Sequence, residues 1–563
     1  MSFLIRSICA CLFCSVHTVA WAADRPNVLF IAVDDLRPEI ASFGAPAMVT
    51  PNLDRLASRG IRFNRAYCMV PTCGASRASL MTGIRPAKNR FVSYTARADE
   101  DAPDATTLNT HFKQHGYRTI SLGKVFHFPA DNRDGWSEPP SRPRASQYAT
   151  DASIKATVKD RKGRARGPSW EDGGDVSDAT YTDGKIANEA ITRLKELAVD
   201  EKPFFLAVGF TKPHLPFVAP GAYFDRYPVA DVKMPQNYFP PKDAPEGAVH
   251  SFGELRSYSD IPKTGILSEA KAKELIRGYQ AATSYTDSNL GRLLDAYDEL
   301  GLDQNTIIVL WGDHGWNLGE HTMWCKHSCF ETSLRSPLIF VTPESMKLPA
   351  NQVSNGLVEF IDVYPTLCEL THLPLPAQLD GESLVPILRD ASVSLKDAAI
   401  SRFKNGDTIR TDQFRYTIYR DNRGGVTGHM LYDHEADPDE NINIADDPKY
   451  VDVVKALAKQ LNASMGKPNG LSSTDGSDQS GSTPIRFVNE LNLDDDQKPK
   501  FLAVQKSMNE KWSKLKTLPE GQRAQERKSL LASRNAQLKK ILTGEQFKMY
   551  LELRAKRNEQ NNR

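Results

Sequence analysis

The sequence predicts an α/β protein whose central sheet is mostly parallel and flanked by helices. Three near-continuous apolar runs, at residues 27–33, 204–210 and 306–311, are typical of buried parallel strands. Segments with helical periodicity lie at 181–197 and 275–300, ahead of the second and third runs. Repeated alternation of strand and helix indicates a largely parallel sheet covered by helices.

The length and composition are those of an ordinary globular chain with two or three domains. The chain has 563 residues, of which 40% are hydrophobic and 25% are charged. Its formal net charge is +1, so we expect no general attraction to nucleic acid or to a membrane surface.

The N-terminus has the pattern of a secretory signal peptide, assigned to residues 1–22. Arg6 precedes a mostly apolar run at 7–19, and Ala20-Trp21-Ala22 supplies a small-residue cleavage site. The run is short for a membrane span, and no other segment is apolar enough to cross a bilayer. We therefore expect cleavage near Ala22 and an exported protein, either periplasmic or secreted.

Metal-binding residue types follow two of the predicted strands. Asp34 and Asp35 come directly after the first, and Asp313 and His314 stand just past the third. Because ligands of open α/β sheets bind outside the carboxyl ends of the strands, these residues are candidates for holding a hard divalent cation. A helix N-cap is the alternative interpretation of the Asp34-Asp35 pair.

Basic and imidazole side chains follow other strand ends. Lys124 and His127 come after a predicted strand at 117–122, where they could converge on an anion, although a solvated lysine and a hydrogen-bonded histidine explain the same pattern. Prolines on both sides stiffen the loop around His214. The segment 131–174 is rich in Pro, Arg, Gly and Ser, and is expected to be a long surface excursion of the kind that often lines a substrate entrance.

The most unusual motif of the chain is at residues 73–83, which read C-G-A-S-R-A-S-L-M-T-G. If this segment enters a helix, Cys73 and Arg77 share one face at its N-terminal end, because they are four residues apart. Unpaired amides and the helix dipole favour an anion or a thiolate there. A disulfide at Cys73 is the alternative in an exported protein.

Five cysteines remain once the predicted signal peptide, with Cys9, Cys11 and Cys14, is removed. They are Cys68, Cys73, Cys325, Cys329 and Cys368. An odd number in an oxidising compartment leaves one thiol spare or chemically special. If that thiol is Cys73, the other four suffice for two disulfides whose pairing the sequence does not determine.

The motif Cys73-Gly74-Ala75-Ser76-Arg77, followed by Leu80 and Thr82-Gly83, resembles the maturation signature of type I, formylglycine-dependent sulfatases. The commonest form of that signature has proline at the third position, and Ala75 is a less frequent variant. The likeness covers roughly residues 25–461 and is closest to the iduronate-2-sulfatase branch. Further motifs carry it: Val33-Asp34-Asp35-Leu36-Arg37-Pro38, Gly123-Lys124-Val125-Phe126-His127, Lys212-Pro213-His214-Leu215-Pro216, and Asp313-His314-Gly315-Trp316 with Gly319-Glu320-His321.

The resemblance implies an alkaline-phosphatase-like fold and a metal site. It implies one calcium ion per chain, held by Asp34, Asp35, Asp313 and His314, with position 73 as a further ligand after a maturation enzyme has converted Cys73 to formylglycine. No other cofactor is implied. A sulfate monoester is anionic and repels nucleophiles, so a divalent ion and nearby lysines suit the chemistry.

The resemblance also implies catalytic roles. Formylglycine at 73 is the nucleophile as its hydrate, and Arg77 and Lys124 hold that hydrate. His214 and Lys326 contact the sulfate, and His214 is the candidate to protonate the departing sugar oxygen. His127 is expected to deprotonate the second hydroxyl, which releases sulfate.

The pattern of apolar and polar residues changes near residue 396. Alternating segments at 408–411 and 414–419 predict a smaller antiparallel sheet, and a helix is expected at 451–461. The residues before this point, 23–395, are assigned to the catalytic domain, and 396–465 to a C-terminal α+β subdomain.

A linker and a tail follow. Residues 466–484 are rich in Gly, Ser and Asp and are assigned to a linker. Residues 485–563 are assigned to a basic helical extension, since 486–563 holds 18 Lys and Arg against 10 Asp and Glu. This extension has no counterpart in the iduronate-type enzymes, and a helical hairpin with a solvated basic face is its expected structure.

The predicted function is therefore hydrolysis of sulfate monoesters on a carbohydrate. The resemblance favours a 2-O-sulfated uronic acid, and another sulfated polysaccharide is equally compatible. Two alternatives stay open: a phosphatase or phosphodiesterase of the same superfamily, and a non-catalytic calcium-binding protein that binds carbohydrate. The expected partners are a sulfated sugar and the maturation enzyme, with no nucleic acid; the sequence leaves the oligomeric state open.

Overall fold

The computed structural model describes residues 25–159, 165–465 and 520–551, together with scattered positions between 491 and 507. The predicted signal peptide (1–22) and linker (466–484) lie outside the described residues. The chain divides into two compact units, Met1–Leu471 and Ser472–Arg563. Among the described helices, none is both long and apolar enough to pass through a bilayer.

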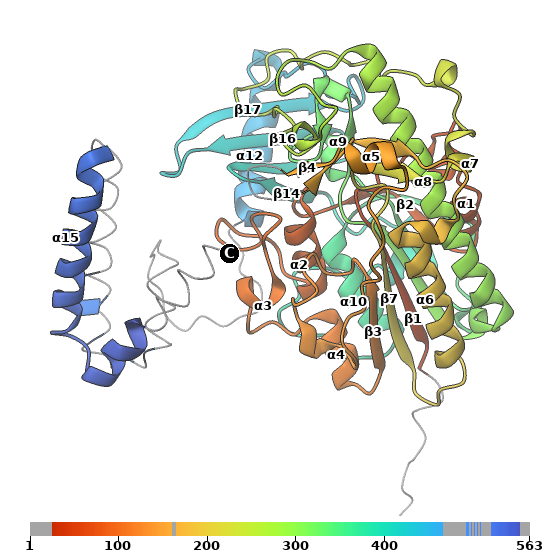
Figure 1. Cartoon of the computed structure of the whole chain (residues 1–563), viewed down its shortest axis with the longest axis horizontal. Helices are drawn as coiled ribbons and strands as arrows, with labels where there is room; N and C mark the ends of the chain where they lie inside the picture. Colours follow the sequence, from red (N-terminus) through yellow and green to blue (C-terminus); the bar gives the residue numbers. More distant parts are fainter. Residues whose placement is uncertain are drawn as a thin grey trace, which may run out of the picture. The chain divides into compact units, whose positions relative to one another are not determined.

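A seven-stranded sheet forms the centre of the first unit, in the order β13-β2-β12-β9-β1-β7-β3 (Figure 1). In that order the strands span Gln352–Glu359, Ile61–Tyr67, Leu338–Val341, Thr306–Gly312, Asn27–Val33, Phe204–Phe210 and Arg118–Gly123. Strand β12 runs antiparallel to both neighbours, and the other four pairings are parallel. The predicted α/β fold with a mostly parallel sheet is confirmed.

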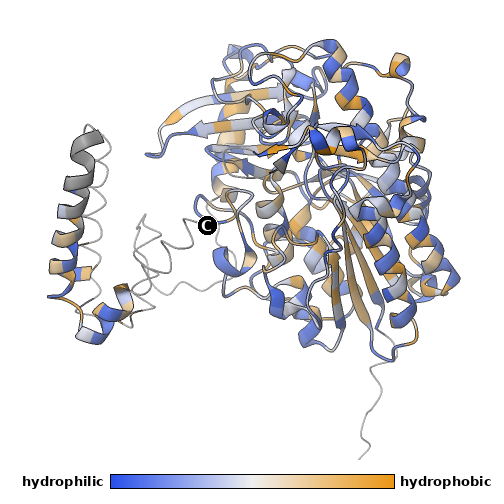
Figure 2. Ribbon diagram, in the orientation of Figure 1, coloured by the Kyte–Doolittle hydropathy of each residue, from blue (hydrophilic) through white to orange (hydrophobic). Residues whose placement is uncertain are grey.

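Helices cover both faces of this sheet, and the strands between them are coloured as strongly apolar in Figure 2. Phe30 of β1 belongs to the hydrophobic core on one face, and its neighbour Ile31 belongs to the core on the other. The helices involved are α2 (Cys73–Thr82), α4 (Leu108–Gln114) and α10 (Val363–Leu370) on the first face, and α1 (Pro51–Ser58), α6 (Thr182–Leu197) and α8 (Glu269–Glu299) on the second. Burial on both faces explains why β1 is apolar at nearly every position.

Helix α2 begins at Cys73 and is buried along its whole length. A Cβ atom on Gly74 would lie 2.1 Å from the carbonyl oxygen of Tyr94. Glycine therefore lets the loop that carries Tyr94 pass directly over the first turn of the helix.

A second, four-stranded sheet completes the first unit. It is antiparallel, with β14 (Ala399–Phe403), β15 (Gly406–Arg410), β16 (Phe414–Arg420) and β17 (Val426–Asp433) in sequence order. Helix α12 (Val451–Met465) packs on it through Leu457 and Leu461. The predicted C-terminal antiparallel sheet and final helix are thus present, while the boundaries 23–395 and 396–465 stay a prediction.

Two details go beyond the sequence expectations. Strand β2 was not anticipated. The excursion at 131–174 includes a short helix, α5 (Asp151–Lys155), and β6 (Trp170–Asp172), which pairs with β8 (Phe217–Ala219).

No disulfide joins the five cysteines of the described residues, although the sequence left room for two. Cys68, Cys73, Cys325, Cys329 and Cys368 are all free and buried. Burial raises the pKa of the Cys329 and Cys368 thiols to about 12, as expected for small side chains that fill a core.

The second unit has a small hydrophobic core of its own. Its described residues include helix α15 (Glu520–Leu538) and a cluster in which Phe501, Leu538, Leu542 and Tyr550 are buried. This agrees with a helical extension, whose limits of 485 and 563 stay a prediction.

Candidate active site

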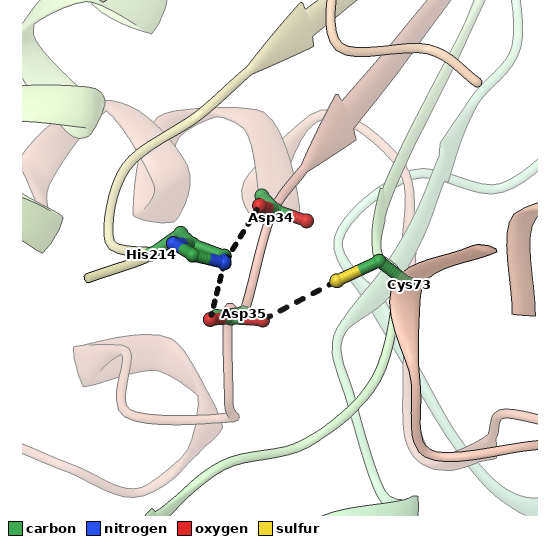
Figure 3. A group of neighbouring side chains, drawn as sticks. All are labelled: Asp34, Asp35, Cys73 and His214. Atoms are coloured by element: carbon green, nitrogen blue, oxygen red, sulfur yellow. Dashed lines mark hydrogen bonds and ion pairs between the residues drawn. The ribbon is translucent and has the colours of Figure 1, made fainter. Parts of the chain in front are cut away.

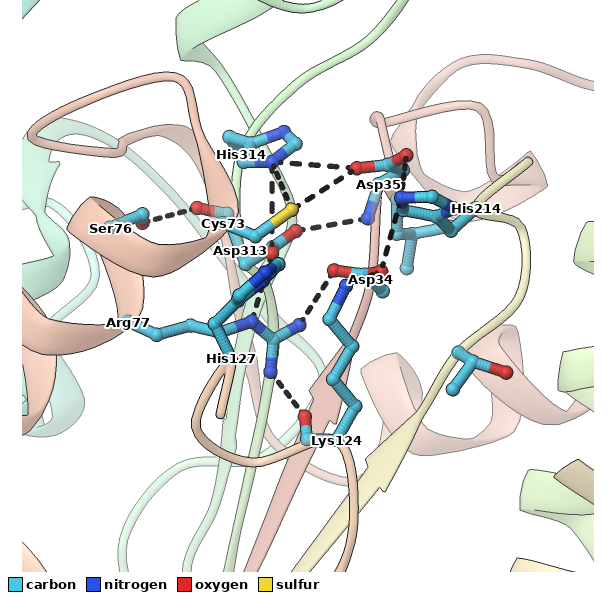
Figure 4. A network of polar contacts seen from close by, with 12 residues as sticks. Asp34, Asp35, Cys73, Ser76, Arg77, Lys124, His127, His214, Asp313 and His314 are labelled. Atoms are coloured by element: carbon cyan, nitrogen blue, oxygen red, sulfur yellow. Dashed lines mark hydrogen bonds and ion pairs between the residues drawn. The ribbon is translucent and has the colours of Figure 1, made fainter. Parts of the chain in front are cut away.

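Three adjacent strands deliver the candidate site residues to one edge of the central sheet. Val33, at the end of β1, pairs with Gly312 of β9 on one side and with Phe210 of β7 on the other. The residues that follow each strand, Asp34 and Asp35, Asp313 and His314, and the loop of His214, therefore emerge side by side. Helix α2 adds Cys73 and Arg77, and all of these side chains point toward one another (Figure 4).

Three buried carboxylates and an imidazole form the metal-site cluster: Asp34, Asp35, Asp313 and His314. The backbone N–H of Asp35 donates to Asp313 Oδ1 at 2.9 Å. His314 Nδ1 donates to the carbonyl oxygen of Gly315 at 2.9 Å, which directs Nε2 toward Asp35 Oδ1 at 3.4 Å and Asp313 Oδ2 at 3.7 Å.

Cys73 lies against this cluster. Its Sγ is 3.3 Å from His314 Nε2 and 3.9 Å from Asp35 Oδ1, and Figure 3 shows the sulfur facing Asp35. Burial, together with the Asp34 and Asp313 carboxylates, raises the pKa of the thiol well above its usual value. The thiolate that the helix N-terminus was expected to favour is therefore not stabilised, because burial and the neighbouring carboxylates favour the neutral thiol.

Two cationic side chains neutralise one side of the cluster. Arg77 donates from Nε to Asp313 Oδ2 and from Nη2 to Asp34 Oδ1, both at 3.0 Å, and Lys124 pairs with the other oxygen of Asp34. Burial alone would raise the pKa of Asp34, but Lys124, His214 and Arg77 hold it well below its usual value. Asp34 is therefore ionised in this arrangement.

Lys326 and His214 lie on the opposite side of the cluster. Lys326 Nζ is 3.0 Å from Asp35 Oδ1, and its side chain is only 3% exposed. His214 Nε2 lies 3.8 Å from Asp35 Oδ2 and 3.9 Å from Asp34 Oδ2. The His214 side chain is 24% exposed and lines a cavity together with Asp34 and Lys124, so this cavity is where a ligand can enter.

His127 is the most loosely connected of the predicted residues. Its ring packs against Tyr94 with 5.9 Å between centroids, and its Nδ1 is buried without a hydrogen-bond partner among the described residues. Burial and the charge of Lys124 lower its pKa to about 3. His127 is therefore neutral near pH 7, as a proton acceptor must be.

Sequence reasoning missed one residue in this group, Glu254. Its Oε1 is 3.2 Å from His214 Nε2, and its Oε2 is 3.1 Å from Lys326 Nζ. Glu254 precedes a single 3₁₀ turn, Leu255–Ser257, in a long connection. It follows no strand and belongs to no motif, so no sequence signal singled it out.

The donor set suits a hard divalent cation. Ligand atoms of Asp34, Asp35, Cys73 and His214 lie within 4.8 Å of one another, and so do those of Cys73, Asp313 and His314, so that the two groups share Cys73. A cation among these carboxylates would be stabilised by their charge. The Nδ1 atom of His314 is fixed by a backbone carbonyl, an arrangement common behind metal ligands.

The sequence matches the family model described as Sulfatase over residues 26–373. Residues 319–467 match a model for the C-terminal part of N-sulphoglucosamine sulphohydrolase. A protein of Formosa agariphila named sulfatase is 34% identical over 490 residues, covering 82% of this chain and 92% of that protein. Iduronate 2-sulfatase of Homo sapiens is 31% identical over 431 residues, covering 70% of this chain and 78% of the human protein.

Solved structures share the fold. One, described as a complex with its substrate D-glucosamine-2-N,6-O-disulfate, has a TM-score of 0.64 at 22% identity and covers 80% of this chain and 100% of its own. A phosphonate monoester hydrolase of Agrobacterium radiobacter also has a TM-score of 0.64, at 23% identity, covering 78% of this chain and 95% of its own. These likenesses support the alkaline-phosphatase-like architecture.

Proposed function

The chain belongs to the sulfatase family, and we propose that it is an exported sulfatase that depends on calcium and on formylglycine at position 73. As a family member it is a sulfuric ester hydrolase that acts on sulfated sugars. The proposed substrate is a 2-O-sulfated uronic acid, or a related sulfated polysaccharide, because iduronate 2-sulfatases are among its relatives.

One observation carries this proposal: position 73 opens a buried helix against a cluster of three carboxylates, and cationic side chains stand on the far side. Asp34, Asp35, Asp313 and His314 would hold calcium. Formylglycine would supply a hydrated aldehyde as nucleophile, and calcium would polarise the sulfate oxygens.

The chain's own residues then have defined tasks. Arg77 and Lys124 approach position 73 from the side of Asp34, where they hold its hydroxyl groups in place. Lys326 and His214 both lie beside Asp35, where the charge of Lys326 neutralises part of a sulfate group that His214 also contacts. His214 Nε2 donates a proton to the departing sugar oxygen, and the neutral ring of His127 accepts one as sulfate is released.

The phosphatase alternative is the second candidate, since phosphonate monoester hydrolases share the fold. The candidate ligands form two groups that share Cys73, which favours one cation position over two. Assaying sulfate and phosphate esters of the same aryl alcohol separates the two functions.

Two measurements test the proposed function. Intact-mass analysis of the protein, produced together with a maturation enzyme, should show a loss of about 18 Da at Cys73. The converted protein should release sulfate from at least one of a panel of defined sulfated mono- and disaccharides, foremost one with a 2-O-sulfated uronic acid. Full conversion without sulfate release from any member of the panel would refute the assignment.

A further inference from the structure

Glu254 is an acidic side chain in a pocket that must receive an anion. It contacts the two residues placed across from Cys73, His214 at 3.2 Å and Lys326 at 3.1 Å. Burial alone would raise its pKa, yet Lys326 and His214 hold that pKa well below the usual value. A fixed negative charge at this place does not help to bind sulfate, which points to a role in the reaction itself.

The loop that carries Glu254 is rigidly anchored. Phe252, Leu255 and Tyr258 on either side are buried in one hydrophobic cluster. Arg256 stacks over the Phe252 ring at 3.9 Å and donates to three backbone carbonyls, those of Ser251, Pro262 and Gly265. Such an anchor holds a carboxylate at one point, as a positioning group requires.

The ring of His214 is oriented from two sides. Nδ1 lies 2.6 Å from the carbonyl oxygen of Leu215, and because a carbonyl only accepts, Nδ1 is the donor. Nε2 then points toward Glu254, its nearest carboxylate, while the Asp34 and Asp35 oxygens are more than 3.7 Å away. Glu254 is thus the contact that fixes where the Nε2 hydrogen points.

Lys326 is shared between two carboxylates. Its Nζ contacts Asp35 at 3.0 Å and Glu254 at 3.1 Å, and it lies 4.8 Å from the centre of the Trp316 ring. Asp35 is a proposed metal ligand, so Glu254 is the partner that keeps Lys326 in place when Asp35 turns its oxygens to a cation.

We propose that Glu254 is a positioning residue: its carboxylate holds His214 Nε2 and Lys326 Nζ at fixed points until the leaving sugar oxygen takes the place of Glu254 as the acceptor of the Nε2 hydrogen. This inference rests on the proposed sulfatase function. As the S–O bond to the sugar breaks, its electron pair stays on the sugar oxygen, and that oxygen takes the proton from Nε2. Glu254 keeps its charge and its bond to Lys326 throughout.

The test removes the charge of the Glu254 side chain and keeps its shape. Glu254→Gln should lower kcat on a hydrolysed sulfated sugar by about 10-fold, less than the roughly 100-fold that loss of a proton donor typically costs. KM and the inhibition constant of inorganic sulfate should stay within about threefold, because sulfate has no leaving group to protonate. Glu254→Asp, which keeps the carboxylate, should recover part of kcat.

Two further variants serve as controls. Glu246→Gln removes an exposed carboxylate from the same connection and should match the wild type. Arg256→Met loosens the anchor without touching the pocket and should lower kcat in the same direction as Glu254→Gln, which covers the case in which the latter does not fold.

Three results for Glu254→Gln would overturn the inference. The first is an unchanged kcat, and the second is an inhibition by sulfate that weakens in parallel with kcat. The third is a lower KM at equal or higher kcat, which would mean that Glu254 competes with sulfate. A wild-type enzyme that releases no sulfate from any sugar defeats the proposed function itself.

Discussion

Two clusters of carboxylates in this molecule have the same kind of composition and different chemistry. The metal-site cluster has Asp34, Asp35, Asp313 and His314, whose ligand atoms fall in two close groups that share Cys73. The second cluster has Glu331, Glu440 and His434, whose ligand atoms also lie close together. The second cluster is built around Arg415, whose Nε is 2.6 Å from Glu440 Oε1 and whose Nη2 pairs with Glu331. We call it the arginine-centred cluster.

The two clusters differ in what faces their carboxylates. In the arginine-centred cluster the guanidinium, 1% exposed, stands between the carboxylates and leaves no task for an ion. In the metal-site cluster Arg77 pairs with Asp34 and Asp313. Lys326 pairs with Asp35, whose carboxylate also faces His314 and Cys73. Residue type alone therefore does not distinguish the two clusters; the thiol and the imidazole that face Asp35 do.

The largest expected effect separates activity from stability at the metal-site cluster. Cys73→Ala should lower sulfate release by at least roughly 1000-fold, because it removes the proposed nucleophile. Its melting temperature should still rise when calcium is added, since the carboxylates remain. Sulfate-release kinetics and calcium-dependent thermal melts check both parts, and turnover retained by this variant would contradict the role of position 73.

The converse is expected at the arginine-centred cluster. Arg415→Met should destabilise the fold by about 3–5 kcal/mol, because it leaves Glu331 and Glu440 buried without their partner. Urea unfolding measures the loss. Lys273→Met, at a more exposed pair with Glu269 on α8, is the matched control and should cost at most about 1 kcal/mol. Equal losses in the two variants would remove the distinction between the clusters.

Calcium addition sharpens the comparison further. After chelation, calcium at 100 times its dissociation constant should stabilise the wild type by about 2.7 kcal/mol. Asp35→Asn should lose this response, whereas Glu331→Gln should keep it despite a lower starting stability. Calorimetry at several calcium concentrations makes the measurement, and a response lost in Glu331→Gln would place the ion in the wrong cluster.

The smallest expected effect is a loss of folding stability at acidic pH. Burial alone would raise the pKa of Glu331 and Glu440, but Arg415 holds both below their usual value in the folded chain. Their contribution is present above the unfolded pKa of roughly 4.3 and is lost as pH falls below it. Chelated wild type should therefore lose about 1–2 kcal/mol between pH 5 and 3 through this cluster. Glu440→Gln, less stable at neutral pH, should show a shallower decline over that range, and an equally steep one would contradict the assignment.

Much of the fold and part of the site followed from local patterns. The runs that became β1, β7 and β9 are apolar because both faces of the sheet are covered, and the strand ends then place Asp34, Asp35, Asp313 and His314 at one edge. The four-residue spacing placed Cys73 and Arg77 on one side of α2. Apolar runs and four-residue spacings involve residues close together in the chain, so they can be read from the sequence.

Most features that the sequence did not predict depend on contacts between residues far apart in the chain. Glu254 reaches Lys326 across 72 residues from a connection without periodicity, and only packing decides which acidic residue of such a loop turns inward. Arg415 meets Glu331 across 84 residues in the same way. Strand β2 was overlooked because its polar positions interrupt the apolar pattern, with Asn64 and Arg65 only half-buried.

Helix α2 is sealed inside the protein, and Cys73 is 2% exposed at its start beneath the loop of Tyr94. Under the proposed function, an enzyme that converts this side chain would need access that the closed fold denies. The conversion would then have to precede closure of the domain, and a chain that folded first would stay unconverted.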